Sequence, residues 1–143
     1  MFSTPVRQLI EPRKLLVAAP ESTVREASKM MASRAVGAVL VVEDDKLLGI
    51  FTERDVVFRV VACGLDPDVT HLAEVMTPEP KTIAPEKAFG VAMALMHENG
   101  FRHLPVVDKG VPIGVVSSRS ALDPELEEFV AEERRRKHIL EQL

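Results

Sequence analysis

The strongest constraint on this chain is an internal repeat: residues 20–55 match residues 85–120 without a gap when the sequence is shifted by 65 positions. Proline, glycine and arginine coincide in the two segments, for example Pro20 with Pro85 and Gly49 with Gly114. Chance alone can produce a shared apolar pattern, but the coincidence of these residues without a gap points to a duplication. The sequence therefore predicts two copies of one structural unit.

Each copy is predicted to contain a leading strand, a helix, two strands joined by a tight turn, and a second helix. Thr23 followed by Glu26 is a capping-box pattern that starts the first helix, and Gly100 ends its counterpart in the second copy. Apolar residues recur at helical spacing in both helices: Val24, Ala27, Met30 and Met31, and Phe89, Ala92, Met93 and Met96. The strands are expected at 15–18, 38–42 and 46–51, and at 81–84, 103–107 and 111–116. The second helices are expected to begin at Thr52 and at Ser117.

This order predicts an α+β protein made of two β-α-β-β-α units. A unit of about 55–60 residues is marginal on its own, so the two units should bury their open faces against each other with pseudo-two-fold symmetry. We expect the units at residues 1–68 and 69–122, followed by a charged C-terminal helix at 123–143. Asp123 suits the N-cap of that helix, with Pro124 in its first turn. The basic run at 134–137 lies beside acidic residues, and we interpret it as a solvated helix face.

The composition argues against several classes of protein. Lys and Arg number 18 against 22 Asp and Glu, a net charge of -4 that opposes a binder of nucleic-acid backbones. The absence of Trp and Tyr opposes a base-stacking surface for single strands. The single cysteine, Cys63, excludes an internal disulfide framework and a cysteine zinc cluster, and we expect it to be a small core residue.

Nothing in the sequence indicates catalysis, a metal site or a membrane segment. The four histidines share no metal-ligand spacing, and no nucleophile with a matching base can be recognised. No window holds the roughly 18 apolar residues that a membrane span needs, and the first residues lack the layout of a signal peptide. We therefore expect a cytoplasmic protein that is not an enzyme and has no catalytic residues.

The segment Gly49-Ile50-Phe51-Thr52-Glu53-Arg54-Asp55 is the most informative part of the first copy. Thr52 suits an N-cap, and Asp55 can return its carboxylate to the free N–H groups of the same helix start. The same geometry also suits a ligand, because a helix start attracts anions and an ionised carboxylate can accept both hydroxyls of a ribose. The two interpretations do not exclude each other.

Two units that each end in Gly-apolar-apolar-Ser/Thr-x-x-Asp or its variant resemble a tandem pair of cystathionine β-synthase (CBS) domains, also called a Bateman module. The resemblance extends from Val6 to Ala121 and includes Val75-Met76-Thr77-Pro78 and Arg102-His103-Leu104-Pro105-Val106-Val107-Asp108. It implies a regulatory module that binds AMP, ADP, ATP, NAD or S-adenosylmethionine between the two domains. Most such modules are not catalysts.

The resemblance also implies roles for particular residues. Asp55 corresponds to the acid that holds the ribose, and Thr52 to the hydroxyl on the phosphate side. The backbone of Gly37 and Ala38 corresponds to the lining of the adenine, and the leading strand of the opposite domain should bring Thr82 and Ile83 to the Asp55 site. The nucleotide-binding residues expected in the first site are Gly37, Ala38, Thr52, Arg54, Asp55, Thr82 and Ile83.

The second copy departs from the pattern, because Ser120 stands where the acid is expected. A neutral hydroxyl cannot replace a charged acceptor, and charge-assisted hydrogen bonds contribute about 1.5–3 kcal/mol each. The sequence therefore predicts a second, weaker site. Arg102 and His103 could hold phosphate oxygens there, so that site is either altered or silent. Its expected residues are Val17, Arg102, His103, Ser117, Arg119 and Ser120.

Two functions from different classes follow. The first is a stand-alone sensor of an adenosine ligand whose output passes to an unknown effector protein or through self-association. The alternative is a structural or dimerisation module that has lost ligand binding, as Ser120 suggests. The resemblance implies a homodimer in either case, with no nucleic-acid or membrane partner.

Overall fold

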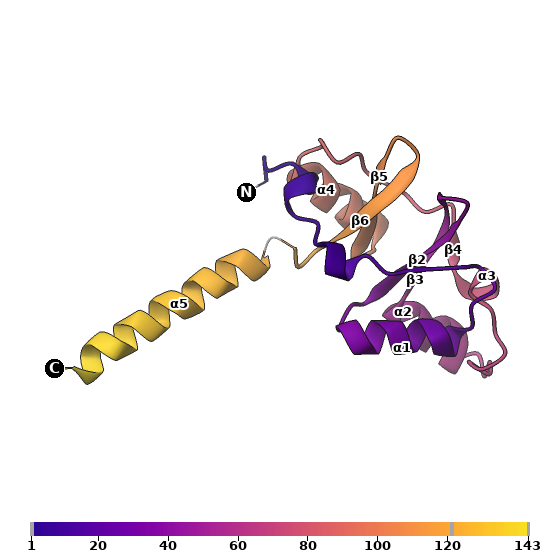
Figure 1. The fold of residues 1–143 in the computed structure, drawn as a ribbon, viewed down its shortest axis with the longest axis horizontal. Coiled ribbons are helices and arrows are strands. Elements are labelled where there is room, and N and C mark those ends of the chain that lie inside the picture. The colour runs from indigo at the N-terminus through magenta and orange to yellow at the C-terminus, as the bar shows by residue number, and fades with distance from the viewer. Residues whose placement is uncertain (1, 121, 143) are drawn as a thin grey trace.

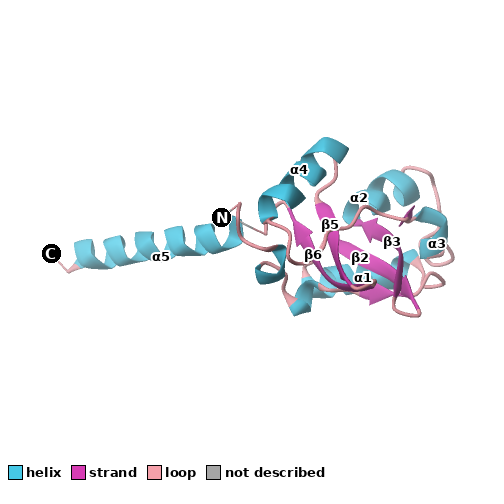
Figure 2. Ribbon diagram, turned by 90° about the horizontal axis from the view of Figure 1, so that it is seen from above, coloured by secondary structure: helices cyan, strands magenta, loops and turns pink. Residues whose placement is uncertain are grey.

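The structure is a computed structural model that describes residues 2–120 and 122–142, with side chains described outside 121–127. Two small sheets with flanking helices form the body, and one long helix leaves it (Figure 1). Helices and strands are mixed along the chain in the order expected for an α+β protein, as Figure 2 shows. The predicted fold class is therefore confirmed.

The first copy forms a four-stranded sheet in the order β1-β2-β3-β4. β1 runs parallel to β2, with Val17 beside Leu40, and β2 pairs antiparallel with β3. Thr23 caps the first helix by accepting a hydrogen bond from the N–H of Glu26 at 3.1 Å, as the sequence pattern predicted. The elements of this copy are β1 (Val17–Ala18), α1 (Val24–Arg34), β2 (Ala38–Glu43), β3 (Lys46–Thr52), α2 (Glu53–Asp55) and the π-helical η3 (Val56–Val61).

The second copy repeats the hairpin in a two-stranded sheet. Its leading segment forms an isolated parallel bridge between Ile83 and Val106, which matches the pairing of β1 with β2. Gly100 ends α4 in the left-handed conformation that glycine favours. The elements here are α3 (Leu72–Val75), β4 (Thr77–Pro78), α4 (Phe89–Asn99), β5 (His103–Asp108) and β6 (Val111–Ser117).

The two copies are interlaced at their edges. The N-terminal segment, with η1 (Val6–Gln8) and η2 (Pro12–Lys14), reaches the second copy, where Val6 is fully buried in the core and donates its N–H to the Lys87 carbonyl. Conversely, β4 lies on the edge of β3. Gly49 permits this approach, because a Cβ there would lie 2.9 Å from the Thr77 carbonyl oxygen.

Each copy has its own core, and a third cluster lies between the sheets. The first core gathers the apolar face of α1 with β2 and β3, and the second gathers α4 with β5 and β6. The third cluster packs Ala38, Leu40 and Ile50 of the first sheet against Val115 of the second. This packing gives the two copies a common buried face, as the sequence predicted.

The second copy lacks the helix expected to start at Ser117. Residues 118–120 form a turn, in which the Ser120 N–H donates to the Ser117 carbonyl. In the first copy Val60 anchors the equivalent helix by burying its side chain, whereas the repeat places Glu125 at that position, just after Pro124. An acidic residue cannot anchor the segment on an apolar core.

The long helix α5 (Leu122–Glu141) points away from the body in both views (Figures 1 and 2). The helix includes Asp123 rather than beginning after it, and the Asp123 side chain lies outside the described side chains. Among the described residues, no helix is long and apolar enough to cross a membrane.

Candidate functional site

A cleft of about 840 Å³ opens between the two copies. We call it the central cleft. It lies where β2 and β5 begin and β6 ends, so the pseudo-two-fold arrangement brings equivalent loops of both copies to it. The polar residues that line it are Arg13, Lys14, Ser28, Glu53, Arg102, His103, Ser117, Ser118, Arg119 and Ser120.

Most residues predicted for the second site meet in this cleft. Arg102, His103, Ser117, Arg119 and Ser120 all line it. Val17 does not, because it lies on β1 beside Leu40. Five of the six residues that the sequence assigned to the weaker site therefore line the central cleft.

Gly37 also lines the central cleft, although the sequence assigned it to the Asp55 site. A Cβ at Gly37 would lie 3.0 Å from Oε1 of Glu53 and 3.2 Å from Nε2 of His103. Because glycine has no Cβ, the Glu53 and His103 side chains, which come from opposite copies, can both approach the backbone at residue 37. Ala38, its neighbour, is buried in the cluster between the sheets.

Positive charge dominates the described lining of the central cleft. Arg13, Lys14, Arg102 and Arg119 face a single lining carboxylate, that of Glu53. Outside the lining, Glu11 approaches Arg13 at 3.3 Å and Lys14 at 3.4 Å, which offsets part of their charge. The excess of cations favours an anionic small molecule.

His103 lines the cleft and has a perturbed pKa. Burial of the imidazole lowers the pKa of His103 below its ordinary value of 6.5, because desolvation disfavours the charged form. Glu53 opposes this shift, whereas the nearby Arg102 and Arg119 lower the pKa further. His103 is therefore mostly neutral at pH 7.

The turn that ends β6 forms a compact polar corner of the cleft. The N–H of Ser117 donates to Oγ of Ser120 at 2.8 Å, and the two hydroxyl oxygens lie 3.3 Å apart. The Ser118 N–H donates to the Arg102 carbonyl at 3.0 Å and ties the corner to the start of β5. Hydroxyls and backbone groups thus lie beside two arginine side chains.

Asp55 lies in a different environment. Its Oδ2 accepts from the Thr52 N–H at 2.9 Å and from the Thr52 hydroxyl at 3.2 Å, which completes a capping box. Its Oδ1 lies 3.5 Å from Nε of Arg59. Arg59 also donates to the carbonyls of Val75 and Met76, so it bridges Asp55 to the segment that leads into the second copy.

Of the other residues predicted around Asp55, Thr52 contacts it directly. Thr52 caps the helix and Arg54 is exposed, with its guanidinium 5.0 Å from the Phe58 ring centre. Ile83 belongs to the second core. The segment around Met76 reaches Asp55 through Arg59, and the place of Thr82 and Ile83 at the Asp55 site stays a prediction.

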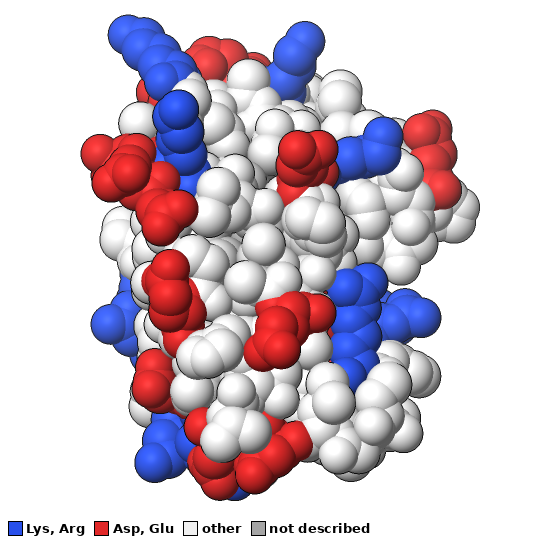
Figure 3. Space-filling view, turned by 90° about the vertical axis from the view of Figure 1, so that its right-hand side faces the viewer, with Lys and Arg blue, Asp and Glu red and all other residues white. Residues whose placement is uncertain are grey.

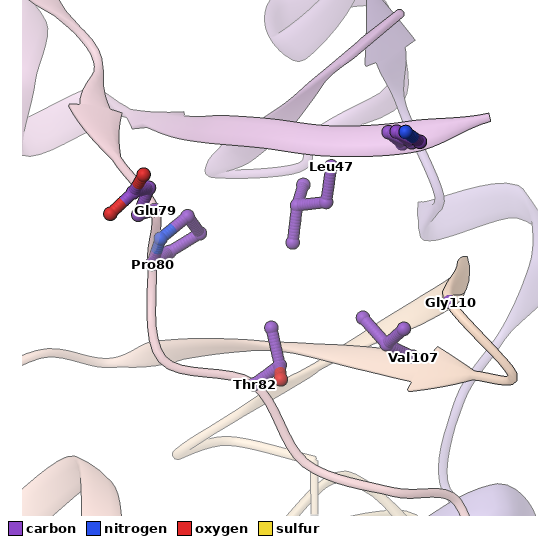
Figure 4. Close-up of a pocket in the computed structure, with 7 residues that line it drawn as sticks. Leu47, Glu79, Pro80, Thr82, Val107 and Gly110 are labelled. Carbon is purple, nitrogen blue, oxygen red and sulfur yellow. The ribbon is translucent and has the colours of Figure 1, made fainter. Parts of the chain in front are cut away.

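Thr82 lines a smaller groove of about 370 Å³ at the other ends of the hairpins, which we call the hairpin groove. Figure 4 shows Leu47 pointing toward Thr82 and Val107 across this groove, with Glu79 and Pro80 at one side. The described residues that line the hairpin groove are polar and apolar in mixture, and they do not form a recognisable catalytic or binding site.

The remaining observations concern the surface and the cysteine. On the face opposite α5, acidic and basic side chains alternate without a continuous basic stretch (Figure 3). Cys63 is exposed, so the expectation of a core cysteine is wrong. Cys63 lies three residues beyond Val60, the buried residue of η3, and its side chain is not part of the core. Among the described residues, no group of three or more His, Cys, Asp or Glu side chains could hold a metal ion.

Sequence reasoning missed Arg13, Lys14 and Glu53 in the cleft, and Arg59 beside Asp55. Arg59 follows Asp55 by four residues, a spacing that brings side chains together on a helix, so it could have been found. Arg13 and Lys14 could not, because their approach depends on the N-terminal segment lying against β6. One packing observation shows this path: a Cβ at Gly114 would lie 2.8 Å from Cβ of Ile10.

Comparison with known proteins identifies the repeat. The family model of the CBS domain matches the chain twice, at residues 6–62 and 72–124. The CBS domain-containing protein CBSCBSPB3 of Arabidopsis thaliana is 36% identical over 110 residues, which cover 76% of this chain and 20% of that protein. The chain thus spans about a fifth of the length of this relative.

Solved structures show the same arrangement. A protein with CBS domains from Burkholderia ambifaria MC40-6 has a TM-score of 0.79 and 33% identity, and the match covers 87% of this chain and 95% of that one. The CBS domain protein PAE2072 from Pyrobaculum aerophilum, solved in complex with AMP, has a TM-score of 0.75 and 26% identity over 82% of this chain and 89% of that one. The chain therefore belongs to the CBS domain family and carries two CBS domains in tandem.

Proposed function

We propose that this chain is a non-catalytic regulatory module that binds an adenosine-containing ligand (AMP, ADP, ATP or NAD) in the central cleft, in a cytoplasmic setting. The observation that carries the proposal is the cleft itself, which both copies line and in which cations exceed carboxylates. Its volume of about 840 Å³ lies in the range of sites for small ligands. The complex of PAE2072 with AMP supports the choice of ligand class.

In this proposal the ligand phosphates lie near Arg102 and Arg119, where charge-assisted hydrogen bonds are strongest. The hydroxyls of Ser117 and Ser120 serve the ribose, and the base lies against the cleft lining that includes the Gly37 backbone. Asp55 remains the proposed ribose acceptor of the first predicted site, which is separate from the central cleft. That site requires Arg59 to release the carboxylate, because the Arg59 guanidinium occupies the position of a bound donor.

Calorimetric titration with AMP, ADP, ATP, NAD and S-adenosylmethionine tests the proposal. We expect saturable binding of at least one anionic nucleotide, and weaker binding in the double variant Arg102→Ala, Arg119→Ala. Arg25→Ala is the control, because Arg25 is exposed and lies outside the cleft lining and outside both predicted sites. Without Trp or Tyr, any retained nucleotide is also visible as absorbance at 260 nm. No binding of any of these ligands, or equal affinity in the double variant, would refute the proposal.

The alternative, a dimerisation module, is favoured by one observation. Val57, Phe58 and Val61 on η3 and Val69 in the loop after it expose between 56% and 70% of their surface, and exposed apolar side chains that gather on a surface mark an interaction site. A homodimer through this patch is compatible with ligand binding. Sedimentation of Phe58→Ser against the parent chain tests the dimer, and the calorimetry above decides whether ligand binding has been lost.

A further inference from the structure

The helix α5 is a part of the molecule that the proposed function does not use. It contains 20 residues and, at 1.5 Å per residue, is about 30 Å long. Every described side chain of residues 128–142 is exposed. Most helical stability in proteins comes from packing an apolar face against other elements, and the described side chains of α5 have no such packing within this chain. The matched CBS domains end at residue 124, before most of this helix.

The sequence of α5 has the spacing of a coiled-coil seam. Phe129, Glu133, Arg136 and Leu140 follow one another at intervals of four, three and four residues. This alternation places them on one stripe of a helix. Phe129 and Leu140, the two apolar members, expose 63% and 69% of their surface. The stripe is therefore apolar toward both ends and charged in the middle.

The charges of this stripe distinguish the two ways in which identical helices can pair. In a parallel pair each position meets its own copy, so Glu133 would face Glu133 and Arg136 would face Arg136. In an antiparallel pair Glu133 faces Arg136 of the second helix twice, and Phe129 faces Leu140 twice. Like charges at facing positions are destabilising and opposite charges are favourable, so the pattern favours the antiparallel arrangement.

We propose that α5 pairs with α5 of a second copy of this chain in an antiparallel coiled coil. The two-fold axis lies between Arg134 and Arg135, and the same surface contributes from both copies, as in other isologous dimers. The two outer layers are Phe129 against Leu140 of the second copy. The two central layers are Glu133 against Arg136 of the second copy.

The ion pairs within α5 leave the central charges available for this contact. Arg136 approaches Glu132 and Glu133 at 3.7 Å in each case, and all three side chains are about half exposed or more. Exposed pairs of this kind contribute little. Arg135 makes the shorter contact with Glu132, at 2.7 Å, and lies one residue away from the stripe.

Charge variants of the full-length chain test the pairing. Arg136→Glu makes the centre of the stripe acidic, and Glu133→Arg makes it basic, so each variant alone should associate at least tenfold more weakly than the parent chain. An equimolar mixture should recover association to within about threefold of the parent, because each Glu then faces an Arg again. Arg135→Glu and Glu128→Arg are the matched controls, since they carry the same charge changes about a third of a turn away from the stripe.

Sedimentation equilibrium gives the association constants, and circular dichroism at 222 nm reports whether α5 remains helical. Concentration-dependent association of the parent, loss in the single variants and recovery in the mixture support the proposal. A parent chain that stays monomeric at 100 μM overturns it. So does a mixture that associates no more tightly than its components, or a control variant that weakens association as much as the stripe variants.

Discussion

The substitution Asp55→Ala tests how much the Asp55 carboxylate of the first copy contributes to the stability of the fold. The Oδ2 atom of Asp55 accepts from the Thr52 N–H at 2.9 Å, and the Asp55 side chain is only 12% exposed. Removal of the carboxylate leaves that N–H without its partner, which costs about 1–3 kcal/mol. With about 2–4 °C per kcal/mol for a chain near this size, we expect the melting temperature to fall by about 4–8 °C at a loss of 2 kcal/mol.

Asp55→Ser is the matched variant, because the second copy already contains this arrangement. There Oγ of Ser120 accepts from the Ser117 N–H at 2.8 Å. A serine at 55 can make the same bond, so we expect a loss of less than about 1 kcal/mol, the cost of exchanging good capping residues. The lost ion pair with Arg59 adds little, since Arg59 is about half exposed.

Urea unfolding followed by circular dichroism, with melting curves as a second measure, compares the parent and the two variants in the absence of nucleotide. The expected order of stability is parent, Asp55→Ser and then Asp55→Ala. Equal stabilities for the alanine and serine variants would refute the capping argument. Equal stability of Asp55→Ala and the parent would show that the hydrogen bonds of this carboxylate make no net contribution.

Three further predictions concern the cleft and the edge between the copies. Ser120→Asp adds a charged acceptor to the open cleft, and calorimetry should show nucleotide binding about tenfold tighter, the equivalent of 1.4 kcal/mol; unchanged affinity would contradict the role given to this position. Gly49→Ala pushes a methyl group to within 2.9 Å of the Thr77 carbonyl oxygen, so urea unfolding should show a loss of about 1–3 kcal/mol, and an unperturbed midpoint would contradict it. Burial lowers the pKa of His103 below 6.5; the unfolded chain therefore takes up this proton first as pH falls, and the folded state loses stability below that value. An anionic ligand favours the charged imidazole, so binding near pH 6 should take up a proton in the parent but not in His103→Gln, as measured by calorimetry in two buffers of different ionisation enthalpy.

The helices and strands could be predicted because the repeat provides two sequence patterns for each element. The capping pattern at Thr23 and the glycine at Gly100 marked helix ends where the structure has them. The prediction of a helix that starts at Ser117 was wrong because it assumed that the second unit repeats every element of the first. Its anchoring residue, Val60, has no apolar counterpart there.

The candidate site was harder to predict, because it depends on which loops of the two copies meet. The residues of the second copy and Gly37 come together only through the packing of one unit on the other. Similarly, the interaction of Arg59 with the Val75 and Met76 carbonyls joins segments that are 16 and 17 residues apart. Spacing within one segment could identify the capping box of Asp55, but not the groups that cover it.

The crossing of the chain ends has a consequence for any attempt to divide the molecule. Val6 fills the core of the second copy, while the strand at Thr77–Pro78 completes the sheet of the first. A cut between residues 62 and 72 would therefore leave each fragment holding a piece that the other requires. Two such fragments, each unstable by itself, should recombine when mixed, which makes this chain suited to splitting into complementing halves.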